Sequence, residues 1–361
     1  MKRLATFAAM AALTAASASF ADEVRVYNWS DYIDEALLDK FQAETGIKLI
    51  YDVFDSNEML ETKLLAGNSG YDVVVPTGTF LLRQIAAGAF QKLDFTQLSN
   101  FGNVWGVIQE RTARYDPDNA YSINYMWGTT GIGVNINKVK EALGDEAPID
   151  SLSLVLDPAN MEKLADCGVY VIDAPTELIP AALSYIGENP DAQDAETIKK
   201  AEPVLTAIAP YIRKFHSSEY INALANGDIC VAFGWSGDIL QARDRAAESE
   251  NGVEIVYNAP KEGALMWFDQ MAIPVDAPNP EAAHKFIDFI LDAENMAAAS
   301  NYVYYANGNL ASQAFLVEDV IGDPAIYPGP EALENLYTTK PYAPRVQRVV
   351  TRLWTKVKSG T

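Results

Sequence analysis

Three tryptophans in this chain are each followed within three residues by an aspartate, and this pairing has a chemical use. The three segments are Trp29-Ser30-Asp31-Tyr32, Trp235-Ser236-Gly237-Asp238 and Trp267-Phe268-Asp269. A carboxylate accepts hydrogen bonds from an ammonium group, and an aromatic face packs on methylenes and attracts cations. The pairing therefore suits a ligand with cationic ends and an apolar middle, such as a diamine. By itself it does not separate a diamine from other cations or from sugars.

Each of these segments also has a purely structural interpretation. Tryptophans such as Trp29 are commonly core residues, and Ser30 or Asp31 could cap the helix that follows. Asp238 could cap its own helix in the same way, and Asp269 could form an ion pair with an arginine. Because three coincidences are needed rather than one, we prefer the interpretation as a ligand site.

Strands and helices alternate in the first part of the chain. Apolar runs, helical spacing and glycine stops predict, in order, strand 24–27, helix 34–44, strand 47–54, helix 57–66, strand 71–76 and helix 79–87. This order indicates a parallel sheet with helices on its faces. Ligands of such sheets bind beyond the carboxyl ends of the strands. Trp29 and its neighbours follow the first strand, and Glu177 follows the predicted strand 169–172.

The alternation returns in the second half of the chain. We expect strand 229–233, helix 239–247, strand 252–257 and an amphipathic helix over 280–291. The chain of 361 residues exceeds what one hydrophobic core usually supports. Because no long flexible linker divides it, we predict an α/β protein with two lobes that are joined by crossing strands.

The N-terminus has the features of a secretory signal peptide. Lys2 and Arg3 precede a short apolar run over 4–16, and Ser17-Ala18-Ser19-Phe20-Ala21 offers a cleavage site for signal peptidase. The apolar run is too short to span a bilayer, and no later segment is typical of a membrane helix. We therefore predict cleavage after residue 21, export from the cytoplasm and no stable membrane insertion.

Charge and cysteine content narrow the possible partners. The formal net charge of −22 repels nucleic acid and acidic membranes and attracts cations, although many secreted proteins are acidic for solubility alone. The only cysteines are Cys167 and Cys230. In an oxidising compartment they favour a disulfide, and two free buried thiols remain the alternative.

Two functions other than binding a cationic ligand are compatible with the sequence. The adjacent Tyr304 and Tyr305 could bind ferric iron as phenolates, and two carboxylates could hydrolyse glycans. No dinucleotide fingerprint, phosphate loop or Ser/His/Asp set is evident in the sequence. We therefore expect no cofactor, no metal and no catalytic residues.

The chain closely resembles the periplasmic putrescine-binding proteins of polyamine ABC importers over nearly its whole mature length. The resemblance rests on the segments Tyr27-Asn28-Trp29-Ser30-Asp31-Tyr32, Tyr51-Asp52-Val53-Phe54-Asp55-Ser56-Asn57-Glu58, Thr129-Thr130-Gly131-Ile132-Gly133, Phe215-His216-Ser217-Ser218, Leu224-Ala225-Asn226-Gly227-Asp228-Ile229-Cys230 and Arg352-Leu353-Trp354-Thr355-Lys356-Val357-Lys358. Together these segments are highly specific, whereas no single one of them is.

The resemblance implies the fold and the partners. It implies a type II periplasmic binding-protein fold, with parallel-sheet lobes and a ligand cleft between them. One lobe would comprise residues 22–132 plus 264–313, and the other 133–263 plus 314–361. It also implies a Cys167–Cys230 disulfide, a periplasmic monomer, a polyamine ligand and an inner-membrane ABC permease as partner.

The resemblance further assigns the ligand contacts, residue by residue. They are Trp29, Ser30, Asp31, Tyr32, Thr77, Glu177, Trp235, Asp238, Trp267, Asp269 and Tyr305. Asp269 would bind one ammonium, whereas Asp31, Asp238 and Glu177 would serve the other end. The chain departs from the putrescine-binding pattern at two positions: Thr77 replaces a usual Ser, and Trp267 replaces a usual Phe. Spermidine-binding relatives carry Trp at the second position, so a preference between putrescine and spermidine stays open.

Overall fold

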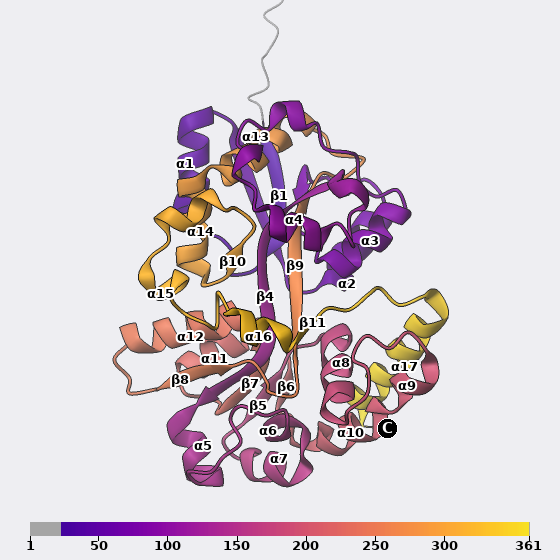
Figure 1. The fold of residues 1–361 in the computed structure, drawn as a ribbon, viewed down its shortest axis with the longest axis vertical. Coiled ribbons are helices and arrows are strands. Elements are labelled where there is room, and N and C mark those ends of the chain that lie inside the picture. The colour runs from indigo at the N-terminus through magenta and orange to yellow at the C-terminus, as the bar shows by residue number, and fades with distance from the viewer. Residues whose placement is uncertain (1–22, 361) are drawn as a thin grey trace, which may run out of the picture.

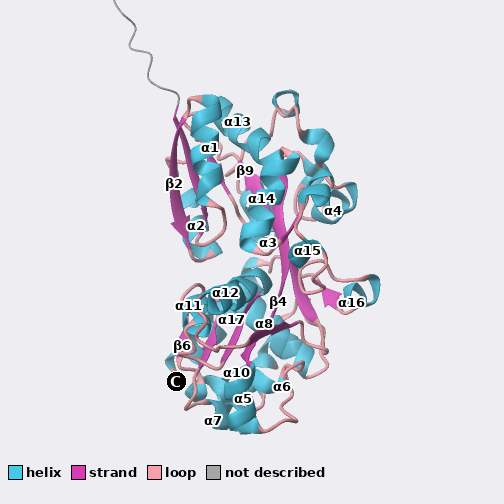
Figure 2. Cartoon of the chain, turned by 90° about the vertical axis from the view of Figure 1, so that its left-hand side faces the viewer, coloured by secondary structure: helices cyan, strands magenta, loops and turns pink. Residues whose placement is uncertain are grey.

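Two long strands join an upper and a lower lobe in the computed structural model, which describes residues 23–360 (Figure 1). They are β4 (Ser122–Asn135) and β9 (Ala264–Ala272), which pair antiparallel and run vertically through the middle of the molecule. Figure 2 shows β4 continuing from one lobe into the other. The predicted signal peptide, residues 1–21, lies outside the described residues.

The strands form one sheet that passes through both lobes. Its order is β2-β1-β3-β9-β4-β7-β5-β6, and β8, β10 and β11 pair at the sides of β4 and β9. The remaining strands are β1 (Glu23–Trp29), β2 (Lys48–Phe54), β3 (Val73–Val74), β5 (Val169–Val171), β6 (Lys214–Phe215), β7 (Val231–Trp235), β8 (Ile255–Asn258), β10 (Ala306–Asn307) and β11 (Leu336–Tyr337). Within each lobe β1, β2 and β3, or β5, β6 and β7, pair parallel as expected, while β4 and β9 add antiparallel neighbours.

Helices cover both faces of the sheet. The α-helices are α1 (Glu35–Thr45), α2 (Asn57–Leu65), α3 (Gly78–Ala86), α4 (Gly106–Thr112), α5 (Ile136–Leu143), α6 (Ser153–Leu156), α7 (Pro158–Leu164), α8 (Pro175–Tyr185), α9 (Ala195–Lys199), α10 (Ala201–Ile208), α11 (Tyr220–Ala225), α12 (Ser236–Glu248), α13 (Pro280–Leu291), α14 (Ala293–Val303), α15 (Glu318–Ile321), α16 (Pro330–Glu334) and α17 (Pro344–Ser359). Short 3-10 helices are η1 (Phe95–Gln97), η2 (Phe101–Asn103), η3 (Pro117–Asn119), η4 (Ala209–Tyr211) and η5 (Ala311–Phe315).

Local signals account well for the boundaries of the first elements. The Asp34 side chain caps α1 by accepting a hydrogen bond from the Ala36 N–H, and Gly46 ends the helix with a left-handed φ of 69°. The predicted helix over 280–291 is confirmed as α13. The predicted strand over 71–76 shortens to β3, which pairs with β1 and β9 through only two residues.

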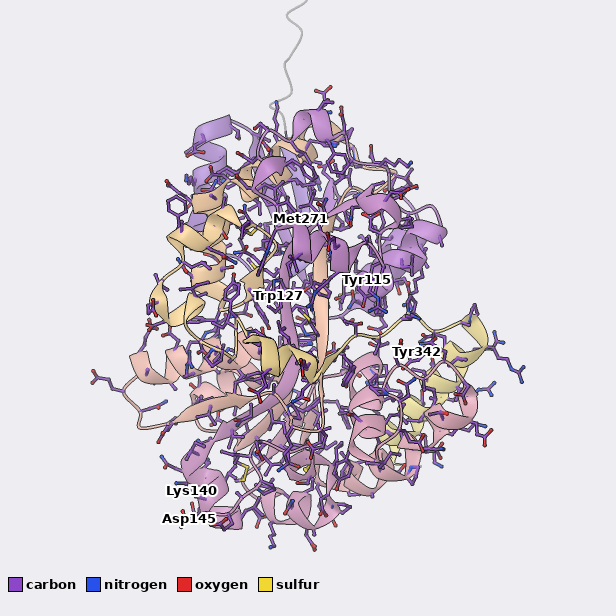
Figure 3. All side chains as sticks on the ribbon, viewed as in Figure 1. Tyr115, Trp127, Lys140, Asp145, Met271 and Tyr342 are labelled. Carbon is purple, nitrogen blue, oxygen red and sulfur yellow. A yellow bond between two sulfur atoms is a disulfide. The ribbon has the colours of Figure 1, made fainter. Side chains whose placement is uncertain are left out.

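Each lobe has its own hydrophobic core. The upper core joins residues from β1, β3, α1 and α13 and ends at Tyr305, whereas the lower core joins β5, β7, α8, α10 and α17. A third, smaller cluster around Trp127 and Phe268 packs against the middle of the crossing strands; Figure 3 labels Trp127 there. The exact residues at which one lobe passes into the other stay a prediction.

A disulfide links two neighbouring strands of the lower lobe. Cys167 and Cys230 are bonded, with their Cα atoms 5.5 Å apart. They precede β5 and β7, which pair directly through Val169 and Val231. The disulfide is therefore confirmed, and free thiols are excluded at both positions. Among residues 23–360, no helix has the length and apolarity needed to cross a bilayer.

Candidate functional site

A cavity lies between the two lobes, and most predicted ligand residues line it. Its lining comprises Trp29, Ser30, Tyr32, Asp55, Thr77, Glu177, Ser217, Trp235, Asp238, Trp267, Asp269 and Tyr305. Ten of the eleven predicted residues are present, and Asp31 is missing. The structure thus brings together side chains from β1, α8, β7, α12 and β9, which are far apart in sequence.

Asp269 sits at the centre of β9 and is almost completely buried, with 4% of its surface exposed. Its carboxylate accepts hydrogen bonds from the Tyr32 hydroxyl at 2.9 Å and from the Thr77 hydroxyl at 2.7 Å. Burial raises the pKa of Asp269 to about 7, because these two hydrogen bonds only partly offset the loss of water, and the charge of Asp238 raises it further.

A chain of hydrogen bonds orients the Thr77 hydroxyl towards Asp269. The Asn57 side-chain amide donates to Thr77 Oγ1 at 3.0 Å, and the Thr77 N–H donates to Asn57 Oδ1 at 3.1 Å. Because its oxygen already accepts from Asn57, the Thr77 hydroxyl points its proton at the carboxylate. The methyl group that distinguishes Thr77 from serine leaves this arrangement intact.

Asp238 forms the second carboxylate, in the first turn of α12. It is 6% exposed and accepts hydrogen bonds from the hydroxyls of Tyr220 and Tyr305, both at 2.7 Å. Burial raises the pKa of Asp238 to about 7, against the effect of both hydroxyls. Tyr220 belongs to the lower core and Tyr305 to the upper core, so this carboxylate is held from both lobes.

Glu177 is the third carboxylate and lies in the first turn of α8. Its oxygens accept hydrogen bonds from the Trp235 indole N–H, at 3.0 Å to each, and from the Thr130 hydroxyl. Burial raises the pKa of Glu177 to about 7. The Trp235 ring is therefore fixed by an acid that also faces the cavity.

Aromatic rings form the walls between these carboxylates. Trp29 contacts Trp235 edge to face with ring centroids 5.5 Å apart, and Tyr305 contacts both Trp267 and Tyr32 at 5.2 Å. Two glycines allow this close packing. A Cβ at Gly237 would lie 2.5 Å from the Tyr305 ring, and a Cβ at Gly128 would lie 2.8 Å from the Trp267 ring.

Asp31 is placed differently from the other predicted residues. It has a left-handed φ of 54° two residues after β1, and its carboxylate pairs with Arg245 of α12 at 2.7 Å. Gln241 of the same helix donates to the Asp31 carbonyl at 3.3 Å. Asp31 therefore links the upper lobe to α12 beside the cavity, and a direct contact with a ligand stays a prediction.

The three tryptophan–aspartate segments occupy different places in the sheet. Trp29 and Trp235 end β1 and β7, but Trp267 and Asp269 lie inside β9. They reach the same cavity because residues two apart in a strand share one face. Asp55 directly follows β2 and accepts a hydrogen bond from Ser30 at 3.0 Å. The expectation that ligands bind beyond the carboxyl ends of strands would therefore also have identified Asp55 as a site residue.

Sequence reasoning missed the residues that hold the carboxylates in place. Asn57, Thr130 and Tyr220 each act on a cavity residue from a distant part of the chain, and nothing in their local sequence marks this role. Ser217, which lines the cavity two residues after β6, was also missed.

The adjacent tyrosines are not arranged as a pair of iron ligands. Tyr305 lines the cavity and donates to Asp238, whereas Tyr304 is not among the lining residues and packs with the cluster around Trp127. The pKa of Tyr305 is raised well above its usual value by burial, and the charge of Asp238 adds to this. Both effects oppose the phenolate that ferric iron needs. Within residues 23–360, no group of three or more His, Cys, Asp and Glu could hold a metal ion.

Comparisons with known proteins agree with this geometry. Residues 36–328 match the family model described as "Bacterial extracellular solute-binding protein". The chain belongs to this family. A further solute-binding protein of similar fold is the spermidine/putrescine ABC transporter substrate-binding protein PotD of Streptococcus pneumoniae, with a TM-score of 0.75 and 27% identity. The match covers 94% of this chain and 99% of that one.

Two curated solute-binding proteins are much more similar in sequence. The putrescine-binding periplasmic protein SpuD of Pseudomonas aeruginosa is 52% identical over 93% of this chain and 92% of its own length. The putrescine-binding periplasmic protein PotF of Escherichia coli is 48% identical over 93% of this chain and 91% of its own length. The match therefore includes both lobes and the cavity between them.

Proposed function

We propose that this chain is a periplasmic receptor that captures a polyamine, putrescine or spermidine, and delivers it to an inner-membrane ABC importer. The observation that carries this proposal is the unbalanced charge of the cavity. Asp55, Glu177, Asp238 and Asp269 face it, and the described residues that line it include no lysine or arginine. A cationic ligand supplies the missing charge, and the proposal describes a binding protein rather than an enzyme.

The lining of the cavity, which combines several carboxylates with aromatic rings, supports a ligand with separated ammonium groups. We assign one ammonium of the ligand to Asp269 and the other end of the ligand to Asp238 and Glu177. The rings of Trp29, Trp235, Trp267 and Tyr305 would enclose the methylenes between them. Asp31 would act from outside the cavity, through its ion pair with Arg245.

Calorimetric titration of the refolded, ligand-free protein tests this function. The titrants are putrescine, cadaverine, spermidine and spermine, and refolding removes any polyamine that is retained through purification. Binding of at least one of them with a Kd of about 1 μM or below is the expected result. Absence of binding by all four contradicts the proposal and leaves the two-lobed fold unaffected.

The same titration decides the role of Trp267. A preference for spermidine that reverts towards putrescine in Trp267→Phe assigns specificity to this ring. An unchanged ranking in the variant means that Trp267 contributes only an apolar wall. We expect the protein to work as a monomer, which light scattering with and without ligand checks.

A further inference from the structure

The C-terminal helix α17 carries an unusual concentration of positive charge for this acidic protein. It contains five basic residues and no acidic one, while the whole chain has 27 basic and 49 acidic residues. Arg345, Arg348, Arg352 and Lys356 are spaced three or four residues apart, so they lie along one face of the helix. The opposite face is apolar and buried in the lower lobe through Val346, Val350, Leu353, Trp354 and Val357.

Three arginines of this face have no partner among residues 23–360. Lys356 pairs with Glu202 at 2.6 Å, and Lys358, on another side of the helix, pairs with Asp173. Arg345, Arg348 and Arg352 are exposed, and among the described residues they form no ion pair or hydrogen bond. We call these three residues the arginine stripe.

Helix stability does not account for the arginine stripe. Arg345 lies in the first turn of α17, where the helix dipole is positive and where the helix has no acidic residue. Arg348 and Arg352 add a like-charge pair four residues apart, which also disfavours the helix. The stripe therefore weakens α17 slightly, so the stability of the helix does not explain it.

The arginine stripe lies on the helix that borders a groove between the two lobes. Another flank of α17, which includes Gln347, Thr351 and Thr355, lines a groove together with Ser56 and Glu58 of the upper lobe. This groove shares Asp55 and Ser217 with the ligand cavity. In Figure 1, α17 lies with α9 on the right-hand side of the lower lobe, below α2 of the upper lobe. A partner on the stripe would touch the rim of the groove, whose walls come from both lobes.

We propose that the arginine stripe is a docking surface for an acidic segment on the periplasmic face of the ABC permease. This inference rests on the proposed function, because it assumes an importer as partner. Guanidinium groups bind carboxylates through paired hydrogen bonds and are favoured at protein interfaces. An anionic membrane surface is the poorer partner, because the net charge of −22 repels it everywhere except at this narrow row.

A triple variant tests the proposal with the full-length mature protein. Arg345→Gln, Arg348→Gln and Arg352→Gln together remove the stripe but no cavity residue. The matched control removes three exposed lysines from other helices: Lys140→Gln in α5, Lys163→Gln in α7 and Lys285→Gln in α13. Figure 3 shows Lys140 at the lower left of the lower lobe, far from α17.

The primary measurement is the stimulation of ATP hydrolysis by the cognate permease in lipid nanodiscs, as a function of receptor concentration. We expect the stripe variant to need about tenfold more receptor for half-maximal stimulation, whereas the control stays within about twofold of wild type. A triple Arg→Lys variant should recover part of the loss, because it keeps the charge without the paired hydrogen bonds. An equal effect in stripe and control variants, or none in either, overturns the proposal.

Two further measurements separate this proposal from its alternatives. Polyamine affinity by calorimetry should be unchanged in the stripe variant. If the proposed function is wrong, the wild-type protein itself does not bind polyamine. If only the docking surface is wrong, the wild-type protein still binds polyamine. Co-sedimentation with phosphatidylglycerol vesicles tests the membrane. Binding of wild type that is lost in the stripe variant, with permease stimulation intact, assigns the stripe to lipid and contradicts the proposal.

Discussion

The two buried carboxylates of the cavity, to which we assign different ends of the ligand, are held in different ways. Asp269 receives its hydrogen bonds from Tyr32 and Thr77, which both belong to the upper lobe, as does Asn57 behind Thr77. Asp238 receives one hydrogen bond from Tyr220 of the lower core and one from Tyr305 of the upper core. One end is thus complete within a single lobe, whereas the other depends on both.

This difference predicts an order of events in ligand capture. Hinged lobes of binding proteins close around their ligands. When the lobes separate, Asp269 keeps its partners, so it can receive the first ammonium in the open form. Asp238 gains the Tyr305 hydroxyl only on closure, so its end of the cavity is completed last. The following predictions test this comparison.

Asp269→Asn should have the largest effect, because it removes the charge from the preformed end. We expect a loss of at least about 2 kcal/mol of binding free energy, in line with breaking a buried charge pair. Titration calorimetry with the best polyamine measures it. The asparagine keeps the shape of the side chain, so thermal unfolding controls for folding. An affinity within twofold of wild type places the ammonium elsewhere.

Acidification should weaken binding at both ends. The pKa values of Glu177, Asp238 and Asp269 are raised to about 7 in the empty cavity, and an ammonium ligand needs the ionised forms. Between pH 8 and pH 6 we expect affinity to fall by about tenfold or more, with proton release on binding near pH 7. Calorimetry in buffers of different ionisation enthalpy measures both quantities.

The stability of the empty protein should show the opposite trend. Because the folded-state pKa values lie above those of the unfolded chain, these groups stabilise the fold at low pH and lose that contribution as pH rises through about 7. Chemical denaturation at pH 6 and pH 8 checks the sign. Asp269→Asn should reduce the pH dependence, and an unchanged dependence would assign it to other groups.

Tyr305→Phe should have a smaller effect and should act on closure. It removes the hydrogen bond from the upper lobe to Asp238, at a cost of about 1 kcal/mol in ligand affinity. Tyr32→Phe is the matched control, because it removes a hydroxyl from Asp269 within one lobe. Small-angle scattering of the liganded proteins should show a larger open fraction for Tyr305→Phe alone. Equal open fractions in both variants contradict the proposed difference between the two ends.

Asp31→Asn should have the smallest effect. Its ion pair with Arg245 is partly exposed, so we expect a loss of about 0.5 kcal/mol of binding free energy. High salt should make this loss smaller, because it screens the ion pair in the wild-type protein. Arg245→Gln should give the same loss, and the double variant should add nothing to either single one. A loss for Asp31→Asn that approaches that for Asp269→Asn means that Asp31 contacts the ligand directly after all.

Much of the architecture was predictable because it depends on local physics. Helical spacing with a cap at Asp34 and a glycine stop at Gly46 located α1, and the order of strands and helices indicated the α/β fold. The acidic and aromatic chemistry of the site followed from residue types. The resemblance to a family then supplied Thr77 and Tyr305 as polyamine contacts, a role that no local pattern marks.

The tertiary structure decided how these residues act. Asp31 and Asp238 both follow a strand-ending tryptophan, yet only Asp238 faces the cavity, because Arg245 draws Asp31 to α12. The raised pKa values arise from burial, which depends on the packing of both lobes rather than on neighbours in sequence. The sequence by itself determined which groups were available, because local propensity and residue chemistry are written in it. Only the meeting of distant segments decided which hydroxyl holds which carboxylate, and from which lobe.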